Sequence, residues 1–276
     1  MTIKSDFHMH TNHSTDSKEP MENMILKAID LGLDTICFTE HHDIDYPPLP
    51  DEPDNDAPFI LNTDSYLYEL LGLRSKYSDR INVLFGVEIG VQPHLRRELA
   101  VYAKSYDFDF IIASTHLIGK KDPYYYSEYF ESKTDEEGYR EYFKEVYECL
   151  RVFNNFDVFG HLDYIVRYGK TKDADYSYDK YKDCIDPILE KILELEKGIE
   201  INTGAIRYGL KDLNPCMDIL KQYKKLGGEI ITIGSDAHET KYIADGFDRA
   251  AQVLKDCGFN YYTTFEKRIA EYHKLV

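Results

Sequence analysis

The sequence predicts an α/β fold, a distorted TIM-like (β/α)7 barrel built by residues 1–276 as a single domain. Three observations lead to this prediction. Seven short runs of β-branched and aromatic residues alternate with segments of helical periodicity. No linker-like stretch divides the chain. Side chains that can bind metal follow nearly every predicted strand at its carboxyl end, where the strands of a parallel barrel converge on one mouth.

The predicted strands are short and apolar, as expected of buried strands. They span 3–8, 35–40, 83–88, 110–116, 158–161, 199–202 and 230–235. Helical patterns lie between and after them, at 21–31, 66–77, 93–106, 137–153, 187–197, 215–226 and 247–257. Strict alternation of strand and helix implies parallel strands, and about seven such units favour a closed barrel over two separate domains.

Two segments have no regular pattern. The segment 43–63 contains five prolines and is the longest irregular region of the chain. The tyrosine-rich segment 122–131 is the second. Long irregular segments of compact domains are often functional, so we expect both to run over one mouth of the barrel.

Composition narrows the class of protein. The chain is 43% hydrophobic but has no apolar run near the ~18 residues that a membrane span needs, and its start lacks a secretory signal, so we expect a soluble, cytoplasmic protein without a membrane partner. The five cysteines form no CxxC pair, which argues against disulfides and thiolate zinc sites. A net charge of -17 argues against long nucleic acid as a partner.

Candidate metal ligands stand at or just beyond the ends of the predicted strands. They are His8, His10, His41, Glu88, His116, His161, Asp236 and His238. A lone histidine at a strand end is more often a hydrogen-bonding residue than a ligand, but so many at equivalent positions are poorly explained as independent cases. Imidazole and carboxylate ligands without thiolates suit zinc, manganese or iron.

Two further residues near this set have open alternatives. Asp16 is either another metal ligand or a loop residue or helix cap ahead of Pro20. His42 directly follows His41, and it either touches substrate and moves a proton at the rim or points elsewhere if the strand continues. With Asp16 the candidate ligands exceed the need of a single ion, and two or three divalent ions could bind if Glu88 bridges.

Six short motifs occur in an order that resembles the polymerase and histidinol phosphatase (PHP) superfamily of metal-dependent phosphoesterases. They are HMH at 8–10, TEHH at 39–42, GVE at 86–88, STH at 114–116, GHLD at 160–163 and SDAH at 235–238. Two longer stretches, GHLDYIVRYG at 160–169 and INTGAIRYG at 201–209, resemble the histidinol-phosphate phosphatase branch. The resemblance implies a PHP-type barrel with a trinuclear metal centre and a role in histidine biosynthesis.

Carried over residue by residue, the family pattern implies three ion sites. The first would be formed by His8, His10, Glu88 and Asp236. The second would be formed by Asp16, His41 and His238. The third would share Glu88 with the first and add His116 and His161.

Two arginines follow predicted strand ends, Arg167 and Arg207. A guanidinium group fits phosphate oxygens with two parallel hydrogen bonds, so we predict both as phosphate clamps; the alternative is a surface or helix-capping arginine. The leaving group needs a proton or a metal contact, for which the sequence offers Asp16 and His42.

The resemblance implies an enzyme that hydrolyses L-histidinol phosphate to L-histidinol and phosphate, and metal-ion chemistry predicts attack on phosphorus by a hydroxide that bridges the ions. The substrate's ammonium and imidazole groups would find partners at Glu40, Asp43 or the 122–131 segment. Two alternatives stay open at this point: a PHP phosphoesterase acting on a nucleotide or another small phosphoester, and a non-catalytic, metal-binding regulatory barrel. The sequence does not indicate the oligomeric state.

Overall fold

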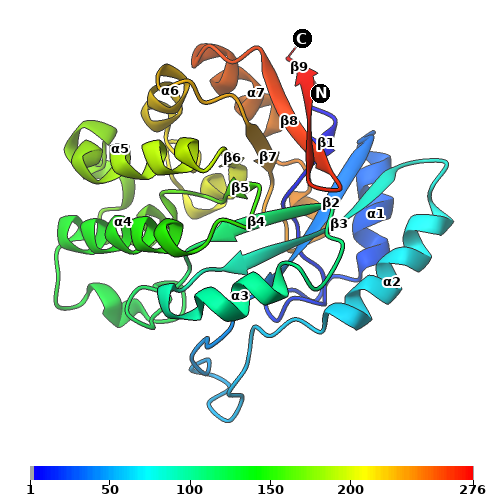
Figure 1. The fold of residues 1–276 in the computed structure, drawn as a ribbon, viewed down its shortest axis with the longest axis horizontal. Helices are drawn as coiled ribbons and strands as arrows, with labels where there is room; N and C mark the ends of the chain where they lie inside the picture. The colour runs from blue at the N-terminus through cyan, green and yellow to red at the C-terminus, as the bar shows by residue number, and fades with distance from the viewer. Residues whose placement is uncertain (1–2, 276) are drawn as a thin grey trace.

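The structure, a computed structural model, describes residues 3–275, and its centre is a seven-stranded parallel sheet surrounded by helices (Figure 1). Each strand pairs with the next one along the chain. The strands are β1 (Ser5–Asp6), β2 (Thr35–His42), β3 (Asn82–Gly90), β4 (Phe110–Ser114), β5 (Val158–Phe159), β6 (Gly198–Asn202) and β7 (Ile231–Gly234). All seven lie where the sequence predicted a strand.

Backbone hydrogen bonds between the first and last strand regions close the sheet into a barrel. The N–H of Phe7 donates to the carbonyl of Ile233 at 3.0 Å, and the N–H of Asp236 donates to the carbonyl of His8 at 2.7 Å. The pairing continues past both strands, where His10 donates to Ala237. The predicted (β/α)7 barrel is therefore confirmed.

The helices follow the predicted alternation. They are α1 (Met21–Asp30), α2 (Thr63–Lys76), α3 (Arg96–Tyr102), α4 (Asp135–Val152), α5 (Tyr178–Glu194), α6 (Met217–Lys225) and α7 (Phe247–Asp256). Two differ from the prediction. The segment predicted at 93–106 is divided between a 3-10 turn, Pro93–Leu95, and α3, while α5 begins nine residues before the predicted start and contains Pro187.

Side chains alternate along each strand between the helices outside and the barrel interior. In β3, Phe85 and Val87 pack in the large outer core with the helices. Leu84 belongs to a smaller inner cluster with Phe110. Leu84, Gly86 and Glu88 are alternate residues of β3, so their side chains share the interior face of the barrel. The strand therefore places an apolar side chain at the amino-terminal end of the interior and a carboxylate at the carboxyl-terminal end.

A C-terminal hairpin closes the other end of the barrel. Its strands are β8 (Tyr261–Glu266) and β9 (Ile269–Lys274), which pair antiparallel and were not predicted. The Phe265 ring lies 5.2 Å from that of Phe110 in the inner cluster. Arg268 donates its N–H to the carbonyl of Asp109, the residue just before β4. In Figure 1 this hairpin is at the top and the segment 43–63 hangs at the bottom.

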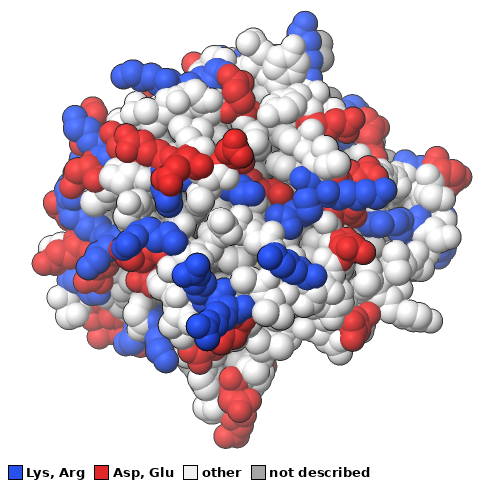
Figure 2. Space-filling view, in the orientation of Figure 1, with Lys and Arg blue, Asp and Glu red and all other residues white. Residues whose placement is uncertain are grey.

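On the face shown in Figure 2, acidic and basic side chains are interspersed, and among the described residues no continuous basic stripe crosses it. Within residues 3–275, no helix has the length and apolar character that crossing a membrane requires.

Candidate metal centre

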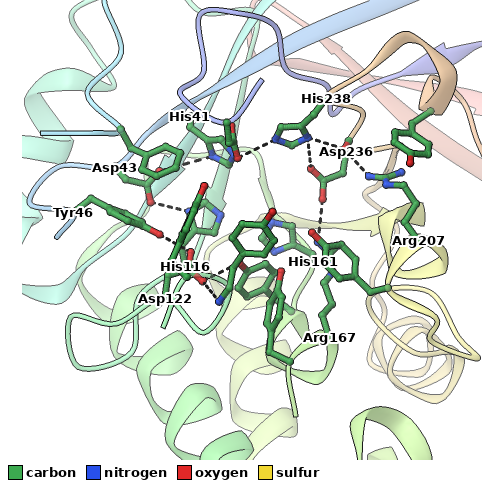
Figure 3. Close-up of a pocket in the computed structure, with 18 of the residues that line it drawn as sticks. His41, Asp43, Tyr46, His116, Asp122, His161, Arg167, Arg207, Asp236 and His238 are labelled. Carbon is green, nitrogen blue, oxygen red and sulfur yellow. Dashed lines mark hydrogen bonds and ion pairs between the residues drawn. The ribbon is translucent and has the colours of Figure 1, made fainter. Parts of the chain in front are cut away.

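A pocket of about 330 Å³ opens at the carboxyl ends of the strands. Its walls combine imidazoles, carboxylates, two arginines and several tyrosines (Figure 3). The two segments predicted to run over the mouth do so: Tyr46 and Phe59 come from the first, and Tyr124 and Tyr125 from the second. The position agrees with parallel barrels in general, whose sites are built from loops after the strands.

The deepest group of ligand-type side chains gathers around one oxygen of Glu88. Its Oε2 lies 3.2 Å from Nε2 of His8 and 3.6 Å from Nε2 of His10. Both of these nitrogens lie within 3.8 Å of Oδ1 of Asp236. All four side chains are almost completely buried, so the structure brings together the whole of the first predicted ion site.

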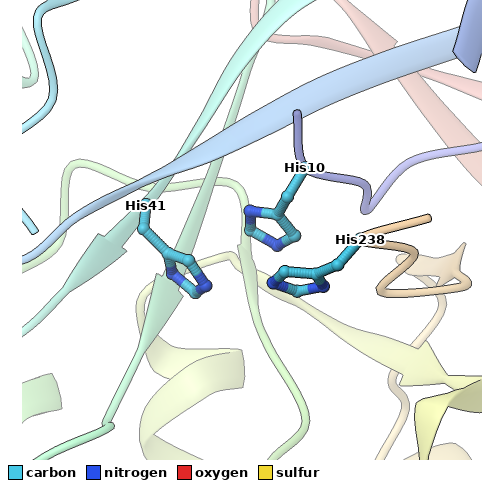
Figure 4. A group of neighbouring side chains, drawn as sticks. All are labelled: His10, His41 and His238. Carbon is cyan, nitrogen blue, oxygen red and sulfur yellow. The ribbon is translucent and has the colours of Figure 1, made fainter. Parts of the chain in front are cut away.

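A second group lies nearer the solvent. Oδ2 of Asp16 is 3.2 Å from Nε2 of His238 and 3.5 Å from Nε2 of His41. The rings of His41 and His238 both stack on His10, each with centroids 4.2 Å apart, which links this group to the first (Figure 4). Asp16 thus contacts the predicted partners rather than capping a helix.

The third group uses the other oxygen of Glu88. Oε1 of Glu88 lies 2.9 Å from Nε2 of His161 and 3.2 Å from Nε2 of His116, and it also accepts a hydrogen bond from Ser114 at 2.6 Å. Glu88 therefore stands between the first and third groups with one oxygen turned to each. This is the position that a bridging carboxylate requires.

Orphaned polar atoms test whether these side chains fit metal ions. Buried polar groups in proteins normally have a hydrogen-bond partner, and each exception calls for an explanation. Among residues 3–275, the buried atoms without one include Nε2 of His8, Nε2 of His10, Nδ1 of His41, Oε2 of Glu88 and Nδ1 of His161. All five belong to residues of groups whose ligand atoms lie within 4.8 Å of one another, so the donor set fits several divalent ions.

The pKa shifts show how strongly these groups interact. Burial raises the pKa of Glu88, but the imidazoles of His8 and His116 outweigh it and hold that pKa well below its usual range. Burial lowers the pKa of His8, yet the carboxylates of Glu200 and Glu88 outweigh it and raise the pKa well above its usual range. Bound cations would take over the role of these protons, because metal ligands bind in their deprotonated form.

The two predicted clamps, Arg167 and Arg207, both reach the pocket wall beside Asp236. Arg167 is buried and donates to Asp236 Oδ2 at 3.1 Å and to the side chains of Asn202 and Asn214 at 2.8 Å. Arg207 donates to the backbone carbonyls of Ser235 at 2.9 Å and Asp236 at 2.6 Å. Neither is a surface arginine, and both are held in fixed orientations.

Side chains alternate between the two faces of β2, so His41 points to the opposite face from Glu40 and His42. His41 faces the ion groups, whereas the ring of His42 stacks on Tyr102 outside the barrel, with centroids 3.6 Å apart, and burial lowers its pKa to about 4. Glu40 also faces outward and accepts hydrogen bonds from Thr11 and Ser14. This corrects two expectations: neither His42 nor Glu40 reaches the pocket, because β2 continues through His42.

Two carboxylates contact histidines of the ion groups, and one of them, Glu200, was missed from the sequence. Glu200 lies inside β6 and contacts His8, and the signal that could have revealed it is an acidic residue within the apolar run GIEIN. Asp43, which was expected to bind substrate, does line the pocket, and its Oδ1 lies 2.7 Å from Nδ1 of His116. Both stand behind a histidine of the ion groups.

The fold and this site together define a barrel hydrolase whose carboxylates and imidazoles converge on a multinuclear metal centre. The chain belongs to the PHP domain family, whose model matches residues 6–204. The six motifs that suggested this family lie around the pocket just described.

Two curated relatives match this chain over nearly its whole length. A histidinol-phosphatase of Lactococcus lactis subsp. lactis is 34% identical over 95% of this chain and 94% of its own length. A probable histidinol-phosphatase of Clostridium acetobutylicum is 35% identical, over 97% and 98% respectively. A crystal structure of the Lactococcus lactis histidinol phosphate phosphatase, complexed with zinc, L-histidinol and phosphate, matches with a TM-score of 0.85 and 32% identity over 97% of this chain and 98% of that chain.

Proposed function

We propose that this chain is a histidinol-phosphate phosphatase, which hydrolyses L-histidinol phosphate to L-histidinol and phosphate. The observation that carries the proposal is one pocket that joins three groups of metal ligands to two fixed arginines. The zinc, L-histidinol and phosphate in the related Lactococcus lactis structure support the same substrate and cofactor class. A role in histidine biosynthesis follows from that activity. The cytoplasmic location stays a prediction.

Each ion would be held by residues that already face one another. The first would take His8, His10, Glu88 and Asp236, the second Asp16, His41 and His238, and the third Glu88, His116 and His161. Bound divalent ions supply positive charge that attracts a phosphate dianion and lowers the pKa of water towards neutrality. The chain has a net charge of -17 and would repel an anionic substrate, so the positive charge of the bound ions offsets this repulsion at the pocket.

Arg167 and Arg207 would hold the phosphate group. Arg167 has five N–H donors and uses three of them on Asp236, Asn202 and Asn214, which leaves donors for phosphate oxygens without reorientation. Because the pocket fixes both guanidinium groups before substrate arrives, little side-chain entropy is lost on binding.

Asp16 would move the proton that the reaction requires. Its Oδ2 lies between His238 and His41 at the pocket wall, and these imidazoles outweigh burial and hold its pKa well below its usual range, so the carboxylate is ionised before the reaction starts. In the hydrolysis the oxygen of water bonds to phosphorus and the bond from phosphorus to the substrate oxygen breaks; Asp16 would pass one proton from the water to that departing oxygen, which becomes the hydroxyl of the product. Of the two candidates named from the sequence, only Asp16 lies in the pocket.

The test is a substrate panel with purified, metal-loaded protein. We expect phosphate release from L-histidinol phosphate far faster than from generic phosphate monoesters or nucleotides. Comparable low rates on every ester would reject the proposed substrate. A nucleotide hydrolysed fastest would move the chain to the alternative phosphoesterase class, and bound ions without any hydrolysis would favour a regulatory barrel.

Arg207→Ala tests the clamp. We expect KM for L-histidinol phosphate to rise and kcat/KM to fall by about 10²-fold, since a charged donor to the phosphate is lost. Lys211→Ala, at an exposed position beyond the same 3-10 turn (Thr203–Tyr208), is the matched control. Unchanged kinetics for Arg207→Ala would remove this residue from the proposed clamp.

A further inference from the structure

Two buried carboxylates that are not among the predicted ligands lie against histidines of the ion groups, and one of them, Asp43, also has its Oδ2 3.9 Å from Nδ1 of His41. Glu200 approaches His8 and Asp43 approaches His116, in both cases at Nδ1. We propose that Glu200 and Asp43 are positioning residues that each fix the tautomer and ring orientation of one histidine, and that each thereby controls the affinity of a different ion site. The inference rests on the proposed metal-dependent function.

Glu200 lies inside the barrel on β6, with its side chain almost completely buried. Oε1 is 2.6 Å from Nδ1 of His8, and Oε2 accepts the backbone N–H of His161 at 2.9 Å. A carboxylate oxygen accepts in this short contact, so Nδ1 of His8 is the donor and carries a proton. When a cation replaces the second proton of the ring, Nε2 of His8 would be the ligand atom; it points at Glu88 and has no hydrogen-bond partner among the described residues.

Asp43 makes the equivalent arrangement from the end of β2. Its Oδ1 lies 2.7 Å from Nδ1 of His116, whose Nε2 is 3.2 Å from Oε1 of Glu88. The Asp43 side chain is buried, so this contact is shielded from water. Nδ1 of His116 is therefore the donor to Asp43, and its Nε2, which now makes a hydrogen bond with Oε1 of Glu88, would be the atom that binds a cation.

Neighbouring strands carry glycine where these carboxylates need room. A Cβ added at Gly90 would overlap the carboxylate of Asp43, and a Cβ added at Gly234 would overlap both His8 and Oε1 of Glu200. Each pair therefore depends on a gap in an adjacent strand. Such a gap fits a carboxylate placed for its contact with the imidazole rather than one that merely fills space.

The two carboxylates act on opposite sides of Glu88. His8 faces Oε2 of Glu88, in the first ion group, and His116 faces Oε1, in the third. Loss of one carboxylate should weaken one ion and leave the other in place. Removing an outer carboxylate behind a metal-bound histidine typically costs about 10–100-fold in metal affinity.

The experiment measures zinc affinity and stoichiometry in the absence of substrate, by competition with a chromophoric chelator. The variants are Glu200→Gln and Asp43→Asn, each alone and combined with His8→Ala or His116→Ala. Asp122→Asn is the matched control, because this buried pocket carboxylate accepts hydrogen bonds from Tyr46 and Tyr164.

We expect Glu200→Gln and Asp43→Asn each to weaken one zinc equivalent by about 10–100-fold, and Asp122→Asn to leave all zinc equivalents unchanged. The effect of Glu200→Gln should disappear in the His8→Ala background and persist in the His116→Ala background. Asp43→Asn should show the reverse pattern, since only residues that act through each other are non-additive.

Equal losses in both backgrounds, or wild-type zinc binding by the single variants, would overturn the inference. If Glu200→Gln does not fold, Glu200→Asp replaces it: the charge stays but the acceptor moves back by one methylene, and the same loss of zinc affinity is expected. Wild-type zinc affinity in Glu200→Asp would again overturn the inference. Because no substrate is used, the result is independent of whether L-histidinol phosphate is hydrolysed.

Discussion

The two ends of the barrel both bury carboxylates, but they use them in opposite ways. At the amino-terminal end, Asp109 accepts the N–H of Phe85 at 2.9 Å and the guanidinium of Arg74 at 2.8 Å. Asp157 accepts the N–H of Ile111 at 2.8 Å and is paired with Arg268. These carboxylates are satisfied by backbone donors and by arginines, as structural polar groups are.

At the carboxyl-terminal mouth, the carboxylates face imidazoles, and several buried atoms have no hydrogen-bond partner among residues 3–275, including Oε2 of Glu88 and Nε2 of His10. An unsatisfied buried polar atom costs about 1–3 kcal/mol, so a protein keeps several of them together only where something else compensates. Among residues 3–275, the buried carboxylate oxygens without a hydrogen-bond partner, Oε2 of Glu88 and Oδ2 of Asp43, both lie at the mouth. The comparison teaches that hydrogen-bond satisfaction, rather than burial, separates the carboxylates of the base from those of the ion groups.

Glu88→Gln should produce the largest effect at the mouth. The change removes the charge shared by the first and third ion groups, so we expect kcat/KM to fall by at least about 10³-fold and the zinc content to fall with it. Steady-state kinetics and metal analysis on the same sample test this. Full metal content with near wild-type kcat/KM would show that Glu88 does not bridge the groups.

Phe265→Ala should produce the largest effect at the base. Its ring fills the inner cluster of the barrel, and truncating a buried Phe costs about 3–5 kcal/mol of unfolding free energy. Chemical denaturation measures the loss, with Phe265→Leu as the conservative control. We expect kcat/KM per folded molecule to change by less than about two-fold, because the pocket lies at the other end. A large loss of kcat/KM without a loss of unfolding free energy would show that the base of the barrel does not act only on stability.

Removal of the ions tests the mouth without a mutation. Ions that bind only the folded chain stabilise it by about 2.7 kcal/mol when free metal is 100 times Kd. We therefore expect a chelator to abolish phosphatase activity and to lower the unfolding free energy by about this amount. Thermal or chemical unfolding before and after re-addition of zinc measures it. Activity that survives complete removal of metal would contradict the proposed function.

Asp157→Ala tests the satisfied carboxylates of the base. The substitution leaves the N–H of Ile111 without its acceptor and Arg268 without its partner, so we expect a loss of about 2 kcal/mol in unfolding free energy. Zinc affinity should not change. A variant with weakened zinc binding and normal stability would reverse the assignment of the two ends.

His42→Phe should have the smallest effect. The substitution keeps an aromatic ring against Tyr102, so we expect the unfolding free energy to change by less than about 1 kcal/mol and kcat/KM by less than about two-fold. His41→Phe, one position earlier, is the contrasting variant and should lose activity. If both substitutions lower kcat/KM equally, the alternation of side chains along β2 does not decide which histidine takes part in the reaction.

Much of the fold could be predicted because strand and helix periods are local properties of the chain. All seven barrel strands and the regions of all seven helices were predicted. The hairpin of β8 and β9 was not, because its pairing and the insertion of Phe265 into the barrel depend on contacts with residues far away in the sequence. The early start of α5 was also missed, since Pro187 looks like a helix start but is tolerated inside the helix.

The sequence by itself determined the barrel, the residue types that could bind ions and their order along the chain. The reason is that residue spacing and side-chain chemistry are properties of the sequence alone. Only the tertiary structure decided which atoms meet: that His41 faces the pocket and His42 does not, and that Glu200 contacts His8 across 192 positions. The physical reason is that ligand geometry depends on strand parity and on closure of the sheet, which brings the last strand beside the first.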